Sequence, residues 1–197
     1  MGSYAGGKSL MTEDILAGEK VRLIAVDAER DSKLFAGWRN NSEYLRLMDA
    51  DVALHFSIEK MKKWMEENEL SDEVAFFMIK RKEDDQIIGE IGLSGFQGKH
   101  SNAFVGISIG DPENWGKGFG TEAMKVILRY GFSILNLHHI SLTVFEYNPR
   151  GVRSYEKAGF KLEGVQRQFL HRDGRRWDMY RMGILRSEWE EPCQTKR

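Results

Sequence analysis

The chain of 197 residues contains little cysteine and proline and carries almost no net charge. Its single cysteine, Cys193, excludes an internal disulfide, which fits a reducing, cytoplasmic setting. The net charge of −1 gives no general attraction to nucleic acid or to anionic lipid. No apolar run approaches the roughly 18 residues of a membrane span, and no secretory signal is recognisable. We therefore expect a globular protein with no nucleic-acid or membrane partner.

The length and the 41% of hydrophobic residues favour one domain with one sizeable core. Residues 1–10 are rich in glycine, serine and alanine and are typical of an expression leader, so Met11 is the expected native start. Residues 192–197 form a polar tail that we expect to fray. The sequence thus predicts a single domain over residues 11–191.

The spacing of apolar residues predicts an α+β fold with a mixed sheet and helices on its faces. Ser57 and Asn148 are suitable N-caps, and Asp173-Gly174 is a strong hairpin signal. The predicted order is β-α-α-β-β-β-α-β-α-β-β. We expect strands at 21–26, 75–81, 86–94, 103–110, 140–145, 161–170 and 177–185, and helices at 28–40, after Ser57, at 121–134 and between Asn148 and Gly159.

The most informative segment is Asn-Trp-Gly-Lys-Gly-Phe-Gly-Thr-Glu-Ala at residues 114–123. Three glycines allow several backbone N–H groups to face one anion. The helix that follows contributes its unpaired amides and the positive end of its dipole. We interpret the segment as a diphosphate cradle; the alternative is a tight helix entrance without a ligand.

Two better-known glycine loops do not match this segment. A P-loop needs lysine followed by serine or threonine after its last glycine, whereas Lys117 lies between glycines. A dinucleotide fingerprint that starts at Gly116 would need a small residue at Thr121 and an acidic residue near Ile140. Neither motif therefore explains the loop.

With these elements in place, the chain resembles the GNAT superfamily of acetyl-CoA-dependent N-acetyltransferases over residues 18–190. Residues 115–123 are similar to its pyrophosphate loop, and Asn148-Pro149 to Gly159-Phe160 is similar to its second signature, which includes Tyr155. The resemblance is greatest to the spermidine/diamine and the ribosomal-protein N-acetyltransferases, and residues 130–140 and the hairpin at Asp173 favour the polyamine group.

The resemblance implies acetyl-CoA as co-substrate and no metal. Its pantetheine arm is expected to pair with the backbone of one of two diverging parallel strands, and its diphosphate with the glycine loop. Asn148 has two interpretations, a contact to the cofactor arm or a helix cap, and Lys117 is either a charged contact or a solvated lysine. The expected cofactor residues are Ser108, Ile109, Gly110, Gly116, Lys117, Gly118, Phe119, Gly120, Thr121 and Asn148.

Two departures from the family pattern concern side chains. Trp115 stands where the loop commonly has glutamine or arginine, so the usual polar contact is missing. Phe104 stands where many relatives have a strand glutamate that helps to deprotonate the amine. The resemblance therefore does not assign the general base.

A primary amine has a pKa near ~10.4, so its attack on a thioester requires a proton acceptor. Glu90, between Ile88, Gly89, Ile91 and Gly92, is our candidate base, with a solvent-facing strand residue as the alternative. Burial would raise the pKa of its carboxyl group toward a useful value. Glu43, Asp49 and Asp51 are candidates for attracting a cationic acceptor, with surface charge as the default.

The resemblance makes Tyr155 the acid that protonates the departing thiolate; the alternative is a packed core tyrosine. The main hypothesis is direct acetyl transfer to a small di- or polyamine such as spermidine. One alternative acceptor is a protein α-amino group, as in ribosomal-protein acetylation. A second alternative is a non-catalytic acetyl-CoA-binding module. Self-association into a homo-oligomer is also expected from the resemblance.

Overall fold

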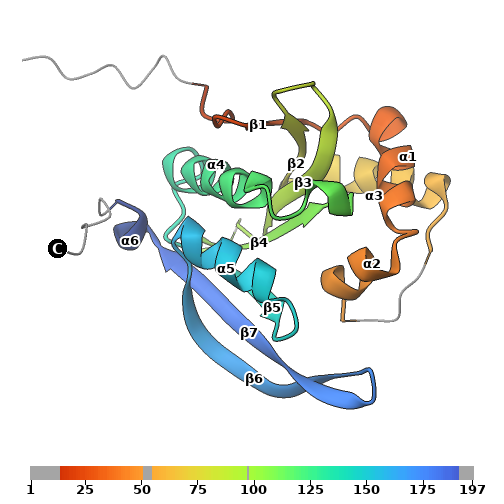
Figure 1. Ribbon diagram of the computed structural model, residues 1–197. Helices are drawn as coiled ribbons and strands as arrows, with labels where there is room; N and C mark the ends of the chain where they lie inside the picture. The colour runs from red at the N-terminus through yellow and green to blue at the C-terminus, as the bar shows by residue number, and fades with distance from the viewer. Residues whose placement is uncertain (1–13, 51–54, 97, 191–197) are drawn as a thin grey trace, which may run out of the picture.

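The computed structural model describes residues 14–50, 55–96 and 98–190 (Figure 1). The predicted leader, Asp51, Cys193 and the tail at 192–197 lie outside these residues. Strands of the described chain form one sheet in the order β1-β2-β3-β4-β5-β7-β6. The strands are β1 (Val21–Ala25), β2 (Val74–Arg81), β3 (Ile87–Ser94), β4 (Asn102–Ile109), β5 (His139–Phe145), β6 (Lys161–Arg172) and β7 (Arg175–Leu185).

The predicted fold class and strand order are confirmed. The predicted helices correspond to α1 (Ala28–Trp38), α3 (Ile58–Glu69), α4 (Phe119–Ser133) and α5 (Pro149–Ala158). Three further elements were not predicted from the sequence: the helices α2 (Ser42–Met48) and α6 (Arg186–Glu190) and the 3₁₀ turn η1 (Pro112–Asn114). No helix of the described segments is long and apolar enough to cross a bilayer.

The chain's capping signals explain where the helices begin and end. The Ser57 side chain accepts a hydrogen bond from the Lys60 amide at the start of α3. Asn148 caps α5 in the same way, by accepting from the Gly151 amide at 2.9 Å, with Pro149 next to it. Gly159 ends α5 with φ of 107°, a left-handed conformation that favours glycine.

Two hydrophobic clusters cover the two faces of the sheet. α4 and α5 lie over one face, where Met124, Ile127 and Leu128 are fully buried (Figure 1). α1, α2 and α3 pack on the opposite face. Neighbouring residues Met78 and Ile79 of β2 enter different clusters, as expected from strand alternation.

β4 and β5 are parallel neighbours that stay together for only a short distance. Asn102, Ala103 and Phe104 pair with His139, Ile140 and Ser141, and the ladder then stops. Beyond it, β4 continues beside β3 and β5 continues beside β7. The expected divergence of two parallel strands is confirmed, and it leaves the β5-facing edge of β4 outside a ladder from Val105 onward.

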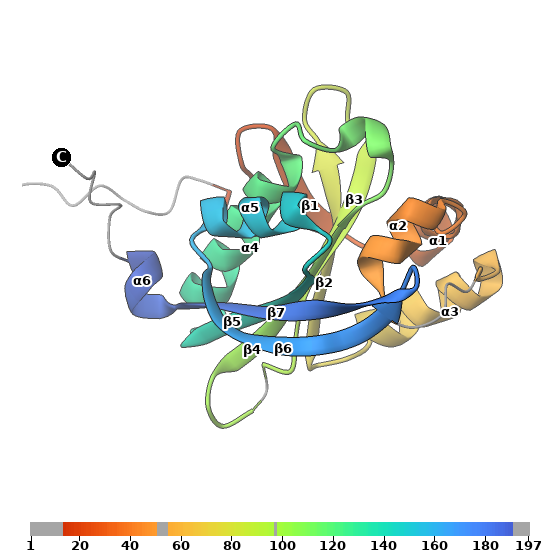
Figure 2. The same cartoon turned by 60° about the horizontal axis from the view of Figure 1, so that its bottom comes forward.

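The hairpin of β6 and β7 reaches across to α2 (Figure 2). Asp173 and Gly174, both with positive φ, form its turn as predicted. Asp173 forms an ion pair with Arg46 of α2, and the Arg172 guanidinium donates to the Arg46 carbonyl oxygen at 2.7 Å. The Tyr147 hydroxyl donates to the same oxygen at 2.8 Å. The hairpin tip therefore holds the C-terminal end of α2.

The α3 cap provides a test of the fold that leaves the site untouched. Replacing Ser57 by alanine should lower the free energy of unfolding by about 1 kcal/mol, because the Lys60 amide loses its acceptor. Urea denaturation measures this change, and Ser57→Asn should retain nearly full stability. Equal losses for alanine and asparagine would contradict the assigned cap.

Candidate active site

The glycine loop has the backbone conformation of an anion site. Gly116 has φ of 74° and Gly118, the N-cap of α4, has φ of 89°, both in the left-handed region. The first amides of a helix have no carbonyl partner within that helix. Those of Phe119, Gly120 and Thr121 begin α4 directly behind the loop. The positive end of the α4 dipole therefore coincides with main-chain amides that are available as donors.

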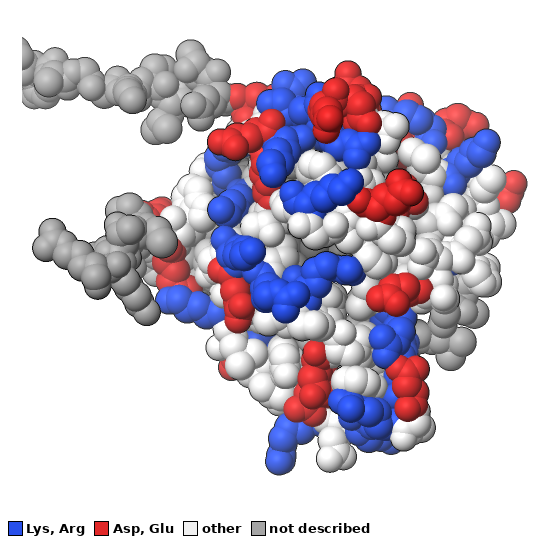
Figure 3. Space-filling model, viewed as in Figure 1, with Lys and Arg blue, Asp and Glu red and all other residues white. Residues whose placement is uncertain are grey.

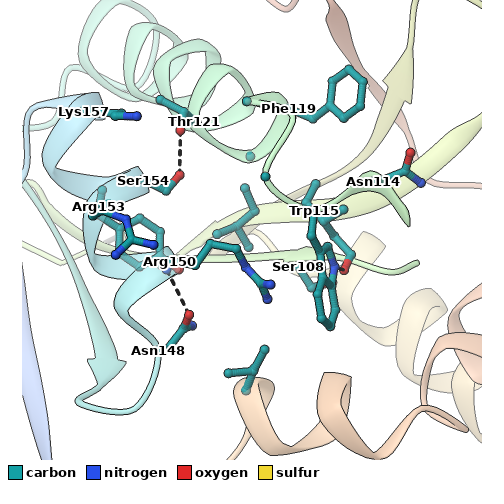
Figure 4. Close-up of a pocket in the computed structure, with 18 of the residues that line it drawn as sticks. Ser108, Asn114, Trp115, Phe119, Thr121, Asn148, Arg150, Arg153, Ser154 and Lys157 are labelled. Carbon is teal, nitrogen blue, oxygen red and sulfur yellow. Dashed lines mark hydrogen bonds between the residues drawn. The ribbon is translucent and has the colours of Figure 1, made fainter. Parts of the chain in front are cut away.

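The loop borders a cavity of about 320 Å³. Its walls come from α2, the end of β4, the loop with the first turn of α4, and α5 (Figure 4). Ile107 and Ile109 of β4 pack with the α4 cluster, whereas Ser108 between them bonds to Tyr44 of the opposite cluster. All four line the cavity. The cavity thus passes through the divergence of β4 and β5 and reaches both faces of the sheet.

Most of the predicted cofactor residues meet at this cavity. Its lining includes Ser108, Ile109, Gly116, Gly118, Phe119, Gly120, Thr121 and Asn148, together with Tyr155. Gly110 is not among the lining residues, and its N–H already donates to the Ile88 oxygen at 2.9 Å. Lys117 lines a separate hollow with Lys20, Arg81 and Lys82. The cavity therefore unites two sequence motifs, but without the Gly110 amide and the Lys117 side chain.

Glu90 is buried, so the solvent-facing alternative is wrong. Its residue is 6% exposed, and burial raises the pKa of its carboxyl group to about 7, although a hydrogen bond with Ser108 opposes this rise. Glu90 lies directly opposite Ser108 in the β3–β4 ladder. Its carboxyl group therefore lies behind the cavity wall and has the pKa of a general base that works near neutral pH.

Tyr155 lies on α5 and lines the cavity. Burial raises the pKa of its hydroxyl to about 12, and the nearby Glu90 carboxylate adds to the rise. The hydroxyl therefore stays protonated at neutral pH, which a proton donor requires. Its ring also packs edge-on against Phe160, at 6.2 Å between centroids. The alternative interpretation, a packed core tyrosine, therefore describes part of its surroundings.

The concern about Phe104 does not apply to this site. Phe104 lies near the start of β4, where it pairs with Ser94 and Ser141, and it is 42% exposed. It is not among the residues that line the cavity. The β4 residue beside Glu90 is Ser108, four positions further along the strand. Phe104 therefore lies away from the cavity and from Glu90.

Trp115 makes a polar contact that the sequence analysis did not anticipate. Its indole N–H donates to the Ile109 oxygen at 2.7 Å, which ties the loop to the end of β4. The Arg150 guanidinium lies 4.0 Å from the centre of the indole ring. Burial lowers the pKa of Arg150, and the charge of Glu43 opposes this effect. Trp115 and Arg150 therefore join the glycine loop to α5 across the cavity.

The sequence analysis also missed a row of polar residues on α5. Arg150, Arg153, Ser154 and Lys157 line the cavity, and their spacing of three and four places them on one side of the helix. The Ser154 hydroxyl bonds to Thr121 at 2.7 Å (Figure 4). Lys and Arg side chains border the opening of the cavity on the face of the molecule that Figure 3 shows. Their spacing of three and four residues was the signal in the sequence that could have revealed this row.

Two of the three acidic acceptor candidates lie in the described residues, and both lie away from the lining. Glu43 and Asp49 are exposed and do not line the cavity. α2 instead contributes Tyr44, Leu47 and Met48, an aromatic and apolar wall. Among the described residues, no group of three or more His, Cys, Asp or Glu side chains is arranged to hold a metal ion.

The raised pKa of Glu90 predicts a pH-dependent stability. A carboxyl group with a folded-state pKa of about 7 binds its proton more tightly than the unfolded chain does. The contribution of Glu90 to the free energy of unfolding should therefore be present at low pH and disappear as the pH rises from about 4.5 through 7. Relative to Glu90→Gln, the wild type should lose about 3 kcal/mol of unfolding free energy between pH 5 and pH 8. Urea denaturation of both proteins measures this, and parallel stability curves would show a solvated Glu90.

Comparisons with known proteins agree with this geometry. Residues 20–161 match the family model described as an acetyltransferase (GNAT) domain. The N-acetyltransferase YoaA of Bacillus subtilis is 38% identical over 51% of this chain and 56% of that protein. The SPbeta prophage-derived N-acetyltransferase YokL of the same organism is 31% identical over 88% of this chain and 94% of its own length.

A solved structure extends the agreement to three dimensions. Spermidine N-acetyltransferase from Vibrio cholerae, in complex with CoA and spermine, matches with a TM-score of 0.78 and 28% identity. The match covers 88% of this chain and 100% of that chain. The family model, which spans most of the folded residues, thus agrees with the diverging strands and the glycine loop, and the chain belongs to the GNAT acetyltransferase family.

Proposed function

We propose that this protein transfers an acetyl group from acetyl-CoA directly to a primary amine, with no covalent intermediate on the enzyme. The observation that carries the proposal is a cavity that joins the glycine loop on one side to Tyr44 and Ser108 on the other. Acetyl-CoA supplies an acetyl group already activated as a thioester. The protein is left to bind, to orient and to move protons.

The proposed cofactor contacts divide into main-chain and side-chain groups. The amides from Gly116 to Thr121 lie at the start of α4, where they can donate to one anion, and they suit a diphosphate. Arg153 and Lys157 of α5 add positive charge along the same cavity. The unpaired edge of β4 beyond Val105 offers backbone groups to the amide-containing pantetheine arm. This arrangement fits acetyl-CoA without requiring a particular side chain at position 115.

Glu90 and Tyr155 suit the two proton transfers of the reaction. Glu90 accepts a proton as a carboxylate, which its pKa of about 7 makes available at neutral pH. Tyr155 keeps its hydroxyl proton and can deliver it to the departing sulfur. The pKa of Glu90 lies near neutrality and that of Tyr155 lies far above it, so one group can accept a proton while the other keeps its own.

A polyamine such as spermidine is one proposed acceptor. The solved relative that was crystallised with CoA and spermine supports this choice. The second candidate is an α-amino group attached to an apolar body, such as a protein N-terminus. It is favoured by the apolar contributions of Leu47 and Met48, and by the lack of any carboxylate side chain among the described lining residues.

Binding and turnover separate these proposals. Isothermal titration calorimetry should detect association with acetyl-CoA, and a thiol-release assay should show turnover. Spermidine, putrescine and peptides with free apolar N-termini test the acceptor. Turnover of polyamines only, or of peptides only, selects between the two classes. Binding without turnover of any amine would favour the non-catalytic acetyl-CoA-binding module.

Replacing Tyr155 by phenylalanine should lower kcat by about a hundredfold, because the departing sulfur loses its proton donor. Acetyl-CoA affinity should remain within a few-fold of wild type, since the glycine loop is unchanged. Steady-state kinetics and calorimetry measure the two effects. Tyr130→Phe, a partly buried tyrosine of α4 outside the cavity lining, is the matched control. An unchanged kcat for Tyr155→Phe would remove Tyr155 from the mechanism.

A further inference from the structure

Glu90 has no direct access to the cavity. It is absent from the lining, whereas Ser108 and Tyr44 are both present there. Ser108 lies directly opposite Glu90 in the β3–β4 ladder and hydrogen-bonds to its carboxyl group, and the Ser108 hydroxyl lies 2.9 Å from the Tyr44 hydroxyl. Tyr44 is 2% exposed and Ser108 is 5% exposed. Two buried hydroxyl groups thus connect the base with the space where an amine would bind.

We propose that Tyr44 and Ser108 form a proton relay that carries the acceptor's proton from the cavity to Glu90. The proposal rests on the proposed function and adds to it the route by which the amine becomes neutral. It assigns roles to α2 and β4 that neither sequence motif indicated.

The relay requires one direction of hydrogen bonding. Ser108 donates to the Glu90 carboxylate, so Tyr44 must donate to the Ser108 oxygen, and the Tyr44 oxygen is then left to accept from the ammonium group. In the step, the ammonium N–H bond breaks and a new O–H bond forms on Tyr44. The original Tyr44 proton moves to Ser108, and the Ser108 proton moves to Glu90. The products are a neutral amine, two unchanged hydroxyls and a protonated carboxyl group.

The surroundings keep the relay dry and hold it in place. Tyr44 belongs to the cluster of α1, α2 and α3, and its amide donates to the Asn41 side chain at the start of α2. The hairpin tip fixes the other end of that helix through Arg46. The titratable groups near the relay are Tyr155 from α5 and Arg39 from the end of α1.

The ionisation of the three relay groups suits these roles. Burial, followed by the charge of Glu90, raises the pKa of Tyr44 well above its usual value, so its hydroxyl remains a donor. Arg39 and the Ser108 hydrogen bond oppose that rise. Glu90 is the only one of the three whose pKa lies near neutrality, at about 7. The proton therefore comes to rest on Glu90, and neither hydroxyl retains it.

The test compares two acceptors of similar shape in Tyr44→Phe and Ser108→Ala. One is an alkyl amine that is protonated at pH 7, and the other is its fluorinated analogue, whose lower pKa leaves it neutral. Each variant should lower kcat/KM for the alkyl amine at pH 7 by about a hundredfold, the scale of general base catalysis. The neutral analogue needs no relay and should lose less than about threefold. Tyr130→Phe and Ser141→Ala, a buried serine of β5 outside the lining, are the matched controls.

The pH profile gives a second readout that a packing defect would not imitate. In Tyr44→Phe, activity toward the alkyl amine should recover only as the pH approaches the amine's own pKa, near ~10.4. Because both hydroxyls act in one chain, the double variant should be little slower than either single variant.

The outcomes separate the relay from the proposed function. Equal losses for the two amines, or an unshifted pH profile in Tyr44→Phe, would overturn the relay while wild-type turnover upholds acetyl transfer. Wild-type protein that acetylates no amine would overturn both. Calorimetric titration of each variant with acetyl-CoA should give wild-type affinity. Affinity lost in proportion to kcat/KM would reduce the two hydroxyls to a structural role.

Discussion

The separation of β4 from β5 is the constraint on which the rest of the molecule depends. A parallel pair normally continues its ladder, and here it stops after three residue pairs. The gap exposes one backbone edge of β4 and opens a passage between the two layers of helices. The glycine loop, α5 and α2 all meet at that passage. A complete ladder would leave the same side chains on two faces of a closed sheet, with no common space.

Burial of polar groups gives this passage its chemical character. Glu90, Ser108 and Asn114 are all buried, although carboxyl and hydroxyl groups are costly to remove from water. The hydrogen bonds that the Ser108 hydroxyl makes with the Glu90 carboxyl group and with the Tyr44 hydroxyl reduce that cost and fix the orientation of Glu90, Ser108 and Tyr44. Stability and the proposed function therefore oppose each other at Glu90, since the burial that raises the pKa of the carboxyl group to about 7 also disfavours its charged form.

Local signals were sufficient to predict the framework. The caps at Ser57 and Asn148, the glycine that ends α5 and the Asp173-Gly174 turn each act over a few residues, and all were recovered. The glycine loop and Tyr155 were found because their motifs are contiguous in the chain. α2 was missed because its seven residues are too few for a clear periodic pattern. The row of basic residues on α5 was missed because a basic side of a helix indicates a binding site only when another wall of a cavity faces it.

The errors at the site have a common physical origin. A strand pattern does not say which position lies beside a gap in the sheet, so the sequence did not show that Ser108 lines the cavity while Phe104 lies away from it. Likewise, the indole N–H of Trp115 could be assigned to the Ile109 oxygen only once the loop and β4 were placed together.

The attachment of the hairpin tip to α2 has a consequence for biosynthesis. Arg46 pairs with Asp173, 127 positions later, so this contact forms only after most of the chain has been synthesised. The glycine loop lies between these two partners in the chain, so it is synthesised before the hairpin tip can hold the wall of the cavity that α2 forms.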